Sequence, residues 1–211
     1  MKSNSQAYDD LNAIRQMMER SSKFLSLSGL SGIFAGISAL VGAAYVYFVL
    51  LQNTGLSYSE YIYSLNQSDA GQSKLQLIAV AFITLMLALA GAFLFSLRKA
   101  RKNNVKYSSK STRQLLIHLL ISLISGGIFC LLLLWHNNAQ LLAPASLLFY
   151  GLALVNAGKF TFGEIHYLGI SQIILGLAAG LLIHQALLLW ILGFGVLHIV
   201  YGMIMYFKYD R

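Results

Sequence analysis

Charged side chains are scarce in this chain of 211 residues: they make up 10% of it, against about a quarter in an ordinary soluble domain. Cysteine and proline occur once each, which excludes a disulfide-stapled scaffold and a collagen-like chain. Hydrophobic residues make up 57% of the sequence, too large a share for an intrinsically disordered protein. The class that remains is an integral membrane protein.

The few charges are segregated along the chain. Six stretches contain no Asp, Glu, Lys or Arg, and each is long enough to cross a hydrocarbon core of about 30 Å, which takes about 20 residues of helix. They cover residues 25–51, 75–97, 115–135, 139–157, 167–185 and 187–207. None shows the alternating pattern of a membrane β-strand. The sequence therefore predicts an all-α polytopic membrane protein with six transmembrane helices in a bundle, and a weak internal similarity suggests helical hairpins as its building unit.

The basic residues predict how this bundle is oriented. Of the fifteen Lys and Arg residues, all but Lys74 lie in segments that an even number of spans places on one side. Because short loops rich in Lys and Arg stay in the cytoplasm, we expect both termini there, in the inner (cytoplasmic) membrane. Residues 1–24 form a cytoplasmic segment, either an interfacial helix or a solvated lead-in, residues 25–207 form the transmembrane domain, and residues 208–211 form a cytoplasmic tail.

The loop after the second span is strongly basic and contains no acid. We interpret it as a topogenic signal that contacts anionic lipids of the bilayer, to which each basic residue contributes about 1 kcal/mol. Docking of a cytosolic protein is the alternative. We expect no nucleic-acid partner, because the retention of basic loops on the cytoplasmic side already explains the net positive charge of the chain. The candidate contact residues are Arg98, Lys99, Arg101, Lys102, Lys106, Lys110 and Arg113.

Polar residues within or beside membrane spans are candidate functional residues. The predicted topology brings six of them to the cytoplasmic side: His118, Asn156, Lys159, Glu164, His166 and Gln172. If they converge on one site, Glu164 is the carboxylate that could serve it as a proton acceptor or metal ligand. The alternative is a solvated loop in which Glu164 caps the fifth helix at its N-terminus.

His198 lies deeper, near the middle of the sixth span, with Tyr201 at helical spacing. One interpretation is a buried neutral imidazole bonded to a Tyr or Ser of a neighbouring helix; the other is a proton relay or ligand site. The histidines are not paired at depths that suit a haem, and the single Cys130 excludes a thiolate zinc site. We expect no cofactor and no metal.

The long loop on the outer side contains three tyrosines, Tyr58, Tyr61 and Tyr63, beside Leu56 and Ile62. Tyrosines at this depth are typical of the aromatic belt at the membrane interface. A lid over a ligand-binding site is the alternative.

Small residues recur at a spacing that allows helices to approach closely. They favour packing within the bundle over packing between the subunits of a homo-oligomer. The residues are Ser28, Gly32 and Gly36 in the first span, Gly169, Gly176 and Gly180 in the fifth, and Gly195 and Gly202 in the sixth.

Three segments, MERSSKFLSLSGLSGIFAG, GKFTFGEIHYLGISQIILGL and GFGVLHIVYGMIMYFKY, resemble a group of small integral membrane proteins from Bacteroidota. The resemblance covers nearly the whole chain. It implies a helical fold in the inner membrane, and it implies no activity and no functional residues.

No nucleotide-binding loop, nucleophile elbow or HExxH motif occurs in the sequence, and no acid lies within a predicted span. We therefore expect a non-enzymatic membrane protein that acts through helix packing and through protein or lipid partners. The alternative is a small transporter or channel for a neutral or anionic solute. An enzyme that uses His118, Glu164 and His166 ranks third.

Overall fold

The computed structural model describes residues 27–67, 70–102 and 110–211. Six helical stretches in this part of the chain are long and apolar enough to cross a membrane: Gly29–Thr54, Gly71–Lys102, Thr112–Trp135, Ala139–Phe160, Gly163–Leu181 and Ile183–Asp210. They confirm the predicted all-α bundle of six spans. The expected segment 1–24 lies outside the described residues.

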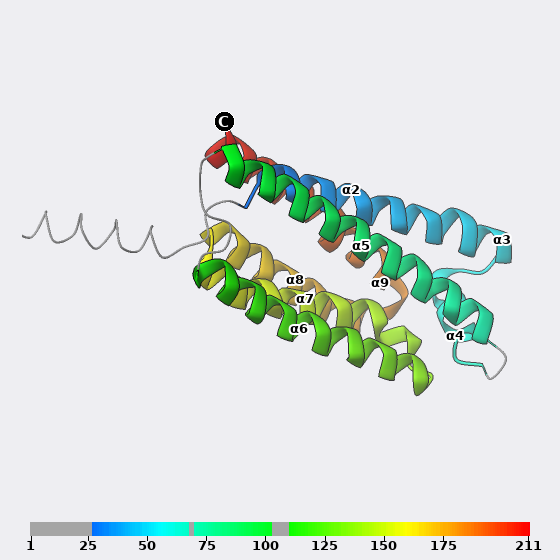
Figure 1. Ribbon diagram of the computed structural model, residues 1–211. Helices are drawn as coiled ribbons and strands as arrows, with labels where there is room; N and C mark the ends of the chain where they lie inside the picture. Colours follow the sequence, from blue (N-terminus) through cyan, green and yellow to red (C-terminus); the bar gives the residue numbers. More distant parts are fainter. Residues whose placement is uncertain (1–26, 68–69, 103–109) are drawn as a thin grey trace, which may run out of the picture.

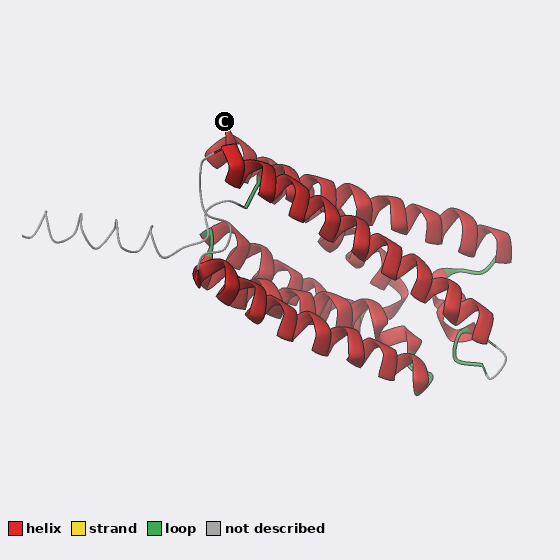
Figure 2. Cartoon of the chain, viewed as in Figure 1, coloured by secondary structure: helices red, strands yellow, loops and turns green. Residues whose placement is uncertain are grey.

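Helix accounts for nearly all of the described chain, with short loops between the elements (Figure 2). The first span consists of α2 (Gly29–Tyr45), the π-helical segment η1 (Val46–Leu51) and α3 (Gln52–Thr54), and the short helix α4 (Tyr58–Ser64) follows it. The next spans are α5 (Gly71–Lys102), α6 (Lys110–Trp135), α7 (Leu142–Ala157) with the 3-10 turns η2 (Ala139–Leu141) and η3 (Gly158–Phe160) at its ends, and α8 (Gly163–Leu181). The last span consists of η4 (Ile183–Gln185), α9 (Ala186–Trp190), the π-helical segment η5 (Ile191–Leu197), α10 (His198–Met205) and η6 (Tyr206–Asp210).

The spans form two packed groups that the last span connects (Figure 1). In one group α5 packs on α2, and in the other α6, α7 and α8 pack in sequence. The last span begins against α7 and α8 through α9 and ends against α2 through α10. Apolar side chains cover the outward faces of α5 and α6, which is what a lipid-facing surface requires.

The C-terminus lies at the end of the bundle where α2 begins (Figure 1), since the Ser28 hydroxyl donates to Asp210 at 2.8 Å. We call this the basic end, because the described residues there include Arg98, Lys99, Arg101, Lys102, Arg113, Lys159, Lys208 and Arg211. The opposite end contains α4, η2, η4 and Lys74. The turn between the last two spans is made by η4, so the stretch from 167 to 207 crosses twice, as its length predicts.

Glycines let the helix backbones touch. A Cβ added to Gly202 would lie 2.6 Å from the Ile33 nitrogen and 2.8 Å from the Gly29 oxygen, so α10 and α2 meet without intervening side chains. Gly151 and Gly169 bring α7 and α8 together in the same way, since a Cβ on either would lie 2.8 Å from the other's oxygen. The small residues therefore allow close packing within the bundle, which is their common role in membrane helices.

Gly180 does not share in this packing. A Cβ at Gly180 would meet only the Pro144 Cβ, at 3.9 Å, in the first turn of α7. The regular spacing of small residues in the fifth span therefore extends one step beyond the close contact between α8 and α7.

Candidate functional site

The strongest polar constellation inside the bundle surrounds His198 at the start of α10. Its side chain meets Tyr150 from α7 and Gln172 from α8, and the Tyr150 hydroxyl lies 2.8 Å from His198 Nε2. Gln172 is 0% exposed and His198 5% exposed. We call Tyr150, Gln172, Gly193 and His198 the His198 cluster.

The hydrogen-bond pattern determines the state of the imidazole. His198 Nδ1 lies 3.0 Å from the Gly193 carbonyl oxygen, which can only accept, so Nδ1 must carry the hydrogen. His198 Nε2 then accepts from the Tyr150 hydroxyl. A neutral ring with its hydrogen on Nδ1 therefore satisfies both ring nitrogens with groups of the bundle.

Gly193 supplies the centre of the cluster from the π-helical segment η5. Its carbonyl accepts from Gln172 Nε2 at 2.7 Å as well as from His198, so side chains use both of its lone pairs. A Cβ on Gly193 would lie 2.6 Å from Gln172 Oε1 and 2.6 Å from Leu147 Cδ2. Only glycine therefore allows Gln172 to approach this closely, and π-helical turns of this kind are frequent at functional sites.

One atom of the cluster is not satisfied. Gln172 Oε1 is buried and has no hydrogen-bond donor within the described part of the chain. A buried acceptor in this state costs about 1–3 kcal/mol. This oxygen is therefore a place in the bundle interior where an additional hydrogen-bond donor would be favourable.

Aromatic rings hold the His198 cluster in place. The Phe194 ring packs 5.0 Å from the Tyr150 ring and lies nearly parallel to the His198 ring, at 14° and 6.0 Å. Trp190 packs on Phe194 at 4.8 Å and donates through Nε1 to the Ser146 hydroxyl at 3.2 Å. The cluster thus links α7, α8 and the last span through fixed groups, and no carboxylate takes part in it.

Sequence reasoning placed Tyr201 beside His198, but Tyr201 packs against the apolar cluster that contains Leu154, Phe162 and Met205. The tyrosine that bonds to His198 is Tyr150. Both residues begin a Tyr-Gly pair in the sequence, and that similarity was the signal that could have directed attention to Tyr150.

The six residues predicted to meet on the cytoplasmic side contact different partners. Gln172 belongs to the His198 cluster, deep in the bundle. Glu164 accepts from Lys208 Nζ at 2.7 Å and from the Tyr209 hydroxyl at 2.9 Å, near the start of α8. Three of the remaining four lie around η3: His118 is exposed and stacks on Phe160, Lys159 is exposed, and His166 packs against Gly158. Asn156 is half-buried near the end of α7.

A second polar cluster, which sequence reasoning did not find, ties the basic end together. Lys99 Nζ lies 2.6 Å from Asp210 Oδ1, and these side chains are only 10% and 8% exposed. Asp210 Oδ2 accepts from the Ser28 hydroxyl and from the Gly29 N–H, both at 2.8 Å. Asp210 therefore caps α2, where a negative charge is favoured. We call Ser28, Gly29, Lys99 and Asp210 the Asp210 cluster.

Lys99 was expected to contact lipid, but it lies inside the bundle, where it also donates to the Leu27 carbonyl at 2.9 Å. Four other basic residues of the predicted contact set, Arg98, Arg101, Lys102 and Arg113, are exposed. Lys106 lies outside the described residues, and the structure describes only the backbone of Lys110.

Within residues 27–67, 70–102 and 110–211, no group of three His, Cys, Asp or Glu side chains could hold a metal ion. Comparison with family models, with curated proteins and with solved structures found no match. The function is therefore argued from the geometry of this bundle.

Proposed function

We propose that this is a non-enzymatic multi-pass protein of the cytoplasmic membrane, whose basic end faces the cytoplasm and binds anionic lipid headgroups. One observation supports this most directly: Arg98, Arg101, Lys102 and Arg113 are exposed at the basic end, whereas Lys74 is the basic residue at the opposite end. Basic residues beside a span are retained on the cytoplasmic side, where anionic lipids attract them.

The described acids at the basic end do not offset this charge. Glu164 is paired with Lys208, and Asp210 is paired with Lys99. The exposed arginines near the end of α5 and the start of α6 therefore present a positive surface at the depth of the lipid headgroups. Arginine suits this role because its planar guanidinium group binds phosphate through two parallel hydrogen bonds.

The His198 cluster supports the non-enzymatic part of the proposal. Its imidazole is saturated by Tyr150 and Gly193, and packed aromatic rings surround it. Such a cluster stabilises a bundle by hydrogen bonds between helices, which contribute about 0.6–2 kcal/mol each in membranes. We also propose membership of the Bacteroidota group that the sequence resembles, in the same inner membrane.

The lipid part of this proposal predicts a large effect of neutralising three neighbouring charges. Replacing Arg98, Arg101 and Lys102 by glutamine removes about 3 kcal/mol of attraction, which is about a hundredfold in affinity for phosphatidylglycerol. The measurement is lipid retention in native mass spectrometry after release from mixed nanodiscs. Lys74→Gln, at the opposite end, is the control and keeps wild-type retention; equal retention by the triple variant would contradict the proposal.

Transport of a small neutral or anionic solute is the second candidate function. The buried, unpartnered Gln172 Oε1 beside a π-helical turn favours it, because such an atom offers a binding point in the bundle interior. Fluxes of glycerol, urea and chloride into proteoliposomes test it. A flux that the wild-type protein carries and the Gln172→Leu variant loses would support transport. If none of the three solutes enters faster than into empty liposomes, the transport hypothesis is wrong.

A further inference from the structure

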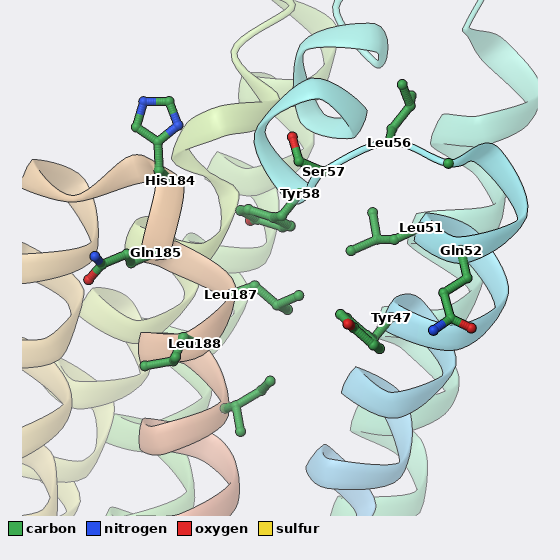
Figure 3. A pocket seen from close by; sticks show the side chains of 12 residues that line it. Tyr47, Leu51, Gln52, Leu56, Ser57, Tyr58, His184, Gln185, Leu187 and Leu188 are labelled. Carbon is green, nitrogen blue, oxygen red and sulfur yellow. The ribbon is translucent and has the colours of Figure 1, made fainter.

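A groove at the opposite end of the bundle separates the end of the first span from the start of the last (Figure 3). Its volume is about 890 Å³, within the range of ligand sites in proteins. Tyr47, Leu51 and Gln52 line one wall, and Leu187 and Leu188 line the other. The chain from Leu56 to Tyr58 passes over the end of the groove (Figure 3).

The residues that line the groove lie at different depths. Gln52, His184 and Gln185 lie at the ends of their spans, at the level of the membrane interface. Tyr47 lies seven residues before the end of its span at Thr54, about 10 Å of helix deeper, and Ile191 lies eight residues after Ile183, about 12 Å deeper. The amide and imidazole side chains of the lining therefore lie nearer the span ends than Tyr47 and Ile191 do.

The structure around the groove is fixed rather than loose. Ser57 and Glu60 form a capping box at the start of α4, and hydrogen bonds from Ser57 lower the pKa of Glu60. Asn66, just after α4, donates to Gln140 at 2.9 Å and accepts from the Ala139 N–H at 3.0 Å, which fastens this segment to η2. Tyr61 and Leu65 are buried beneath it. These contacts fasten the segment that passes over the end of the groove.

The charge of the lining restricts the occupant. None of the twelve lining residues is Asp, Glu, Lys or Arg. Burial raises the pKa of Tyr58 to about 12, so its hydroxyl stays neutral at physiological pH. The lining offers polar side-chain atoms that suit hydrogen bonds to an uncharged or zwitterionic group better than an ion pair. They belong to Tyr47, Gln52, Ser57, Tyr58, His184 and Gln185.

We propose that this groove binds one glycerolipid of the surrounding leaflet, with an uncharged or zwitterionic headgroup. The headgroup lies beside Gln52 and His184, and one acyl chain runs along Leu187, Leu188 and Ile191 towards the middle of the bilayer. A lipid matches both the depth of the groove and the position of its amide and imidazole side chains near the span ends, and it enters sideways from the membrane. The site is independent of the proposed contact with anionic lipids at the basic end.

The test compares two tryptophan substitutions at matched depth and exposure. Leu188 is 63% exposed and lines the groove, whereas Leu75 is 67% exposed on the outward face of α5 near the same end. Native mass spectrometry measures the lipid that remains bound to protein released from nanodiscs of phosphatidylcholine and phosphatidylglycerol. We expect wild type and Leu75→Trp to retain one phosphatidylcholine, and Leu188→Trp to retain it at least tenfold less.

A photoreactive group on the acyl chain of phosphatidylcholine locates the bound lipid. Crosslinks to residues 187–191 are expected in wild type and are lost in Leu188→Trp. Equal retention by Leu188→Trp and wild type, or crosslinks spread equally over α5, would overturn the proposal. Neutralising Arg98, Arg101 and Lys102 leaves phosphatidylcholine retention unchanged, so this site and the proposed function can fail separately.

Discussion

Replacing Lys99 by methionine lowers the free energy of unfolding by about 3–5 kcal/mol, because it leaves a buried carboxylate without its counter-ion. In the folded protein Lys99 is paired with Asp210 at 2.6 Å, and both side chains are almost fully buried. Asp210 in turn receives hydrogen bonds from Ser28 and Gly29 at the start of α2. The loss therefore loosens the contact between α2, α5 and the C-terminal end at once.

Unfolding in mixed detergent micelles measures this effect. Arg98→Met is the matched control, since Arg98 is the neighbouring cation but is exposed, and we expect its unfolding free energy to stay within about 0.5 kcal/mol of wild type. Adding Asp210→Asn to Lys99→Met removes the unpaired charge and restores part of the stability. If Lys99→Met and Arg98→Met cost the same, Lys99 does not hold the Asp210 cluster together.

Replacing His198 by alanine also costs about 3–5 kcal/mol, because it opens a cavity among three spans and removes partners from buried polar groups. The Tyr150 hydroxyl loses its acceptor, and the Gly193 carbonyl loses one of its two donors. The packed rings of Phe194 and Tyr150 hinder collapse of the cavity. This change tests whether the His198 cluster binds the last span to α7 and α8.

His118→Ala is the control for this second variant, because His118 is an exposed histidine on α6. We expect its stability to stay close to wild type, and Tyr150→Phe to lose about 1–3 kcal/mol through the unpaired His198 nitrogen. The same micelle unfolding assay compares the three variants. A His198→Ala protein as stable as His118→Ala would mean that the cluster does not hold the bundle together.

The sequence was sufficient to predict the six spans because charge and hydropathy act locally. A Lys or Arg cannot lie unpaired in the hydrocarbon core, so uncharged stretches mark the spans whatever their packing. The boundaries differ in detail: α5 continues to Lys102, beyond the predicted end at 97, whereas α8 ends at Leu181, before the predicted end at 185. Helical hydrogen bonds persist into the headgroup region, where polar side chains are tolerated.

A Tyr of a neighbouring helix is one of the partners that the sequence predicts for His198, and Tyr150 on α7 is such a residue, but its identity could not be predicted. It depends on the path of the last span, which begins against α7 and α8 and ends against α2. The π-helical segment η5 also shifts the helical register just before His198, so a constant period of 3.6 residues misassigns the faces that follow. His198 and Tyr201 both lie in α10, after this shift, whereas Tyr150 reaches His198 from α7, and spacing along one helix does not identify a partner on another.

Lys99 illustrates a similar limit at the basic end. It belongs to a basic run, and composition alone assigns the whole run to the lipid surface. Ser96 and Ala100, 3% and 1% exposed, mark the side of α5 that faces the bundle. Small residues beside a lysine were the available signal, but the carboxylate that pairs with it lies 111 positions further along the chain.

The central claim is that the basic end faces the cytoplasm and the groove end faces the opposite side. Single cysteines placed in a Cys130→Ala background test it most directly, with a membrane-impermeant maleimide applied to intact and to permeabilised cells. Asn53→Cys lies at the groove end and Arg211→Cys at the basic end, and both native residues are exposed. The account predicts that Asn53→Cys reacts in intact cells and Arg211→Cys only after permeabilisation. The reverse pattern, or labelling of both sites in intact cells, would contradict it.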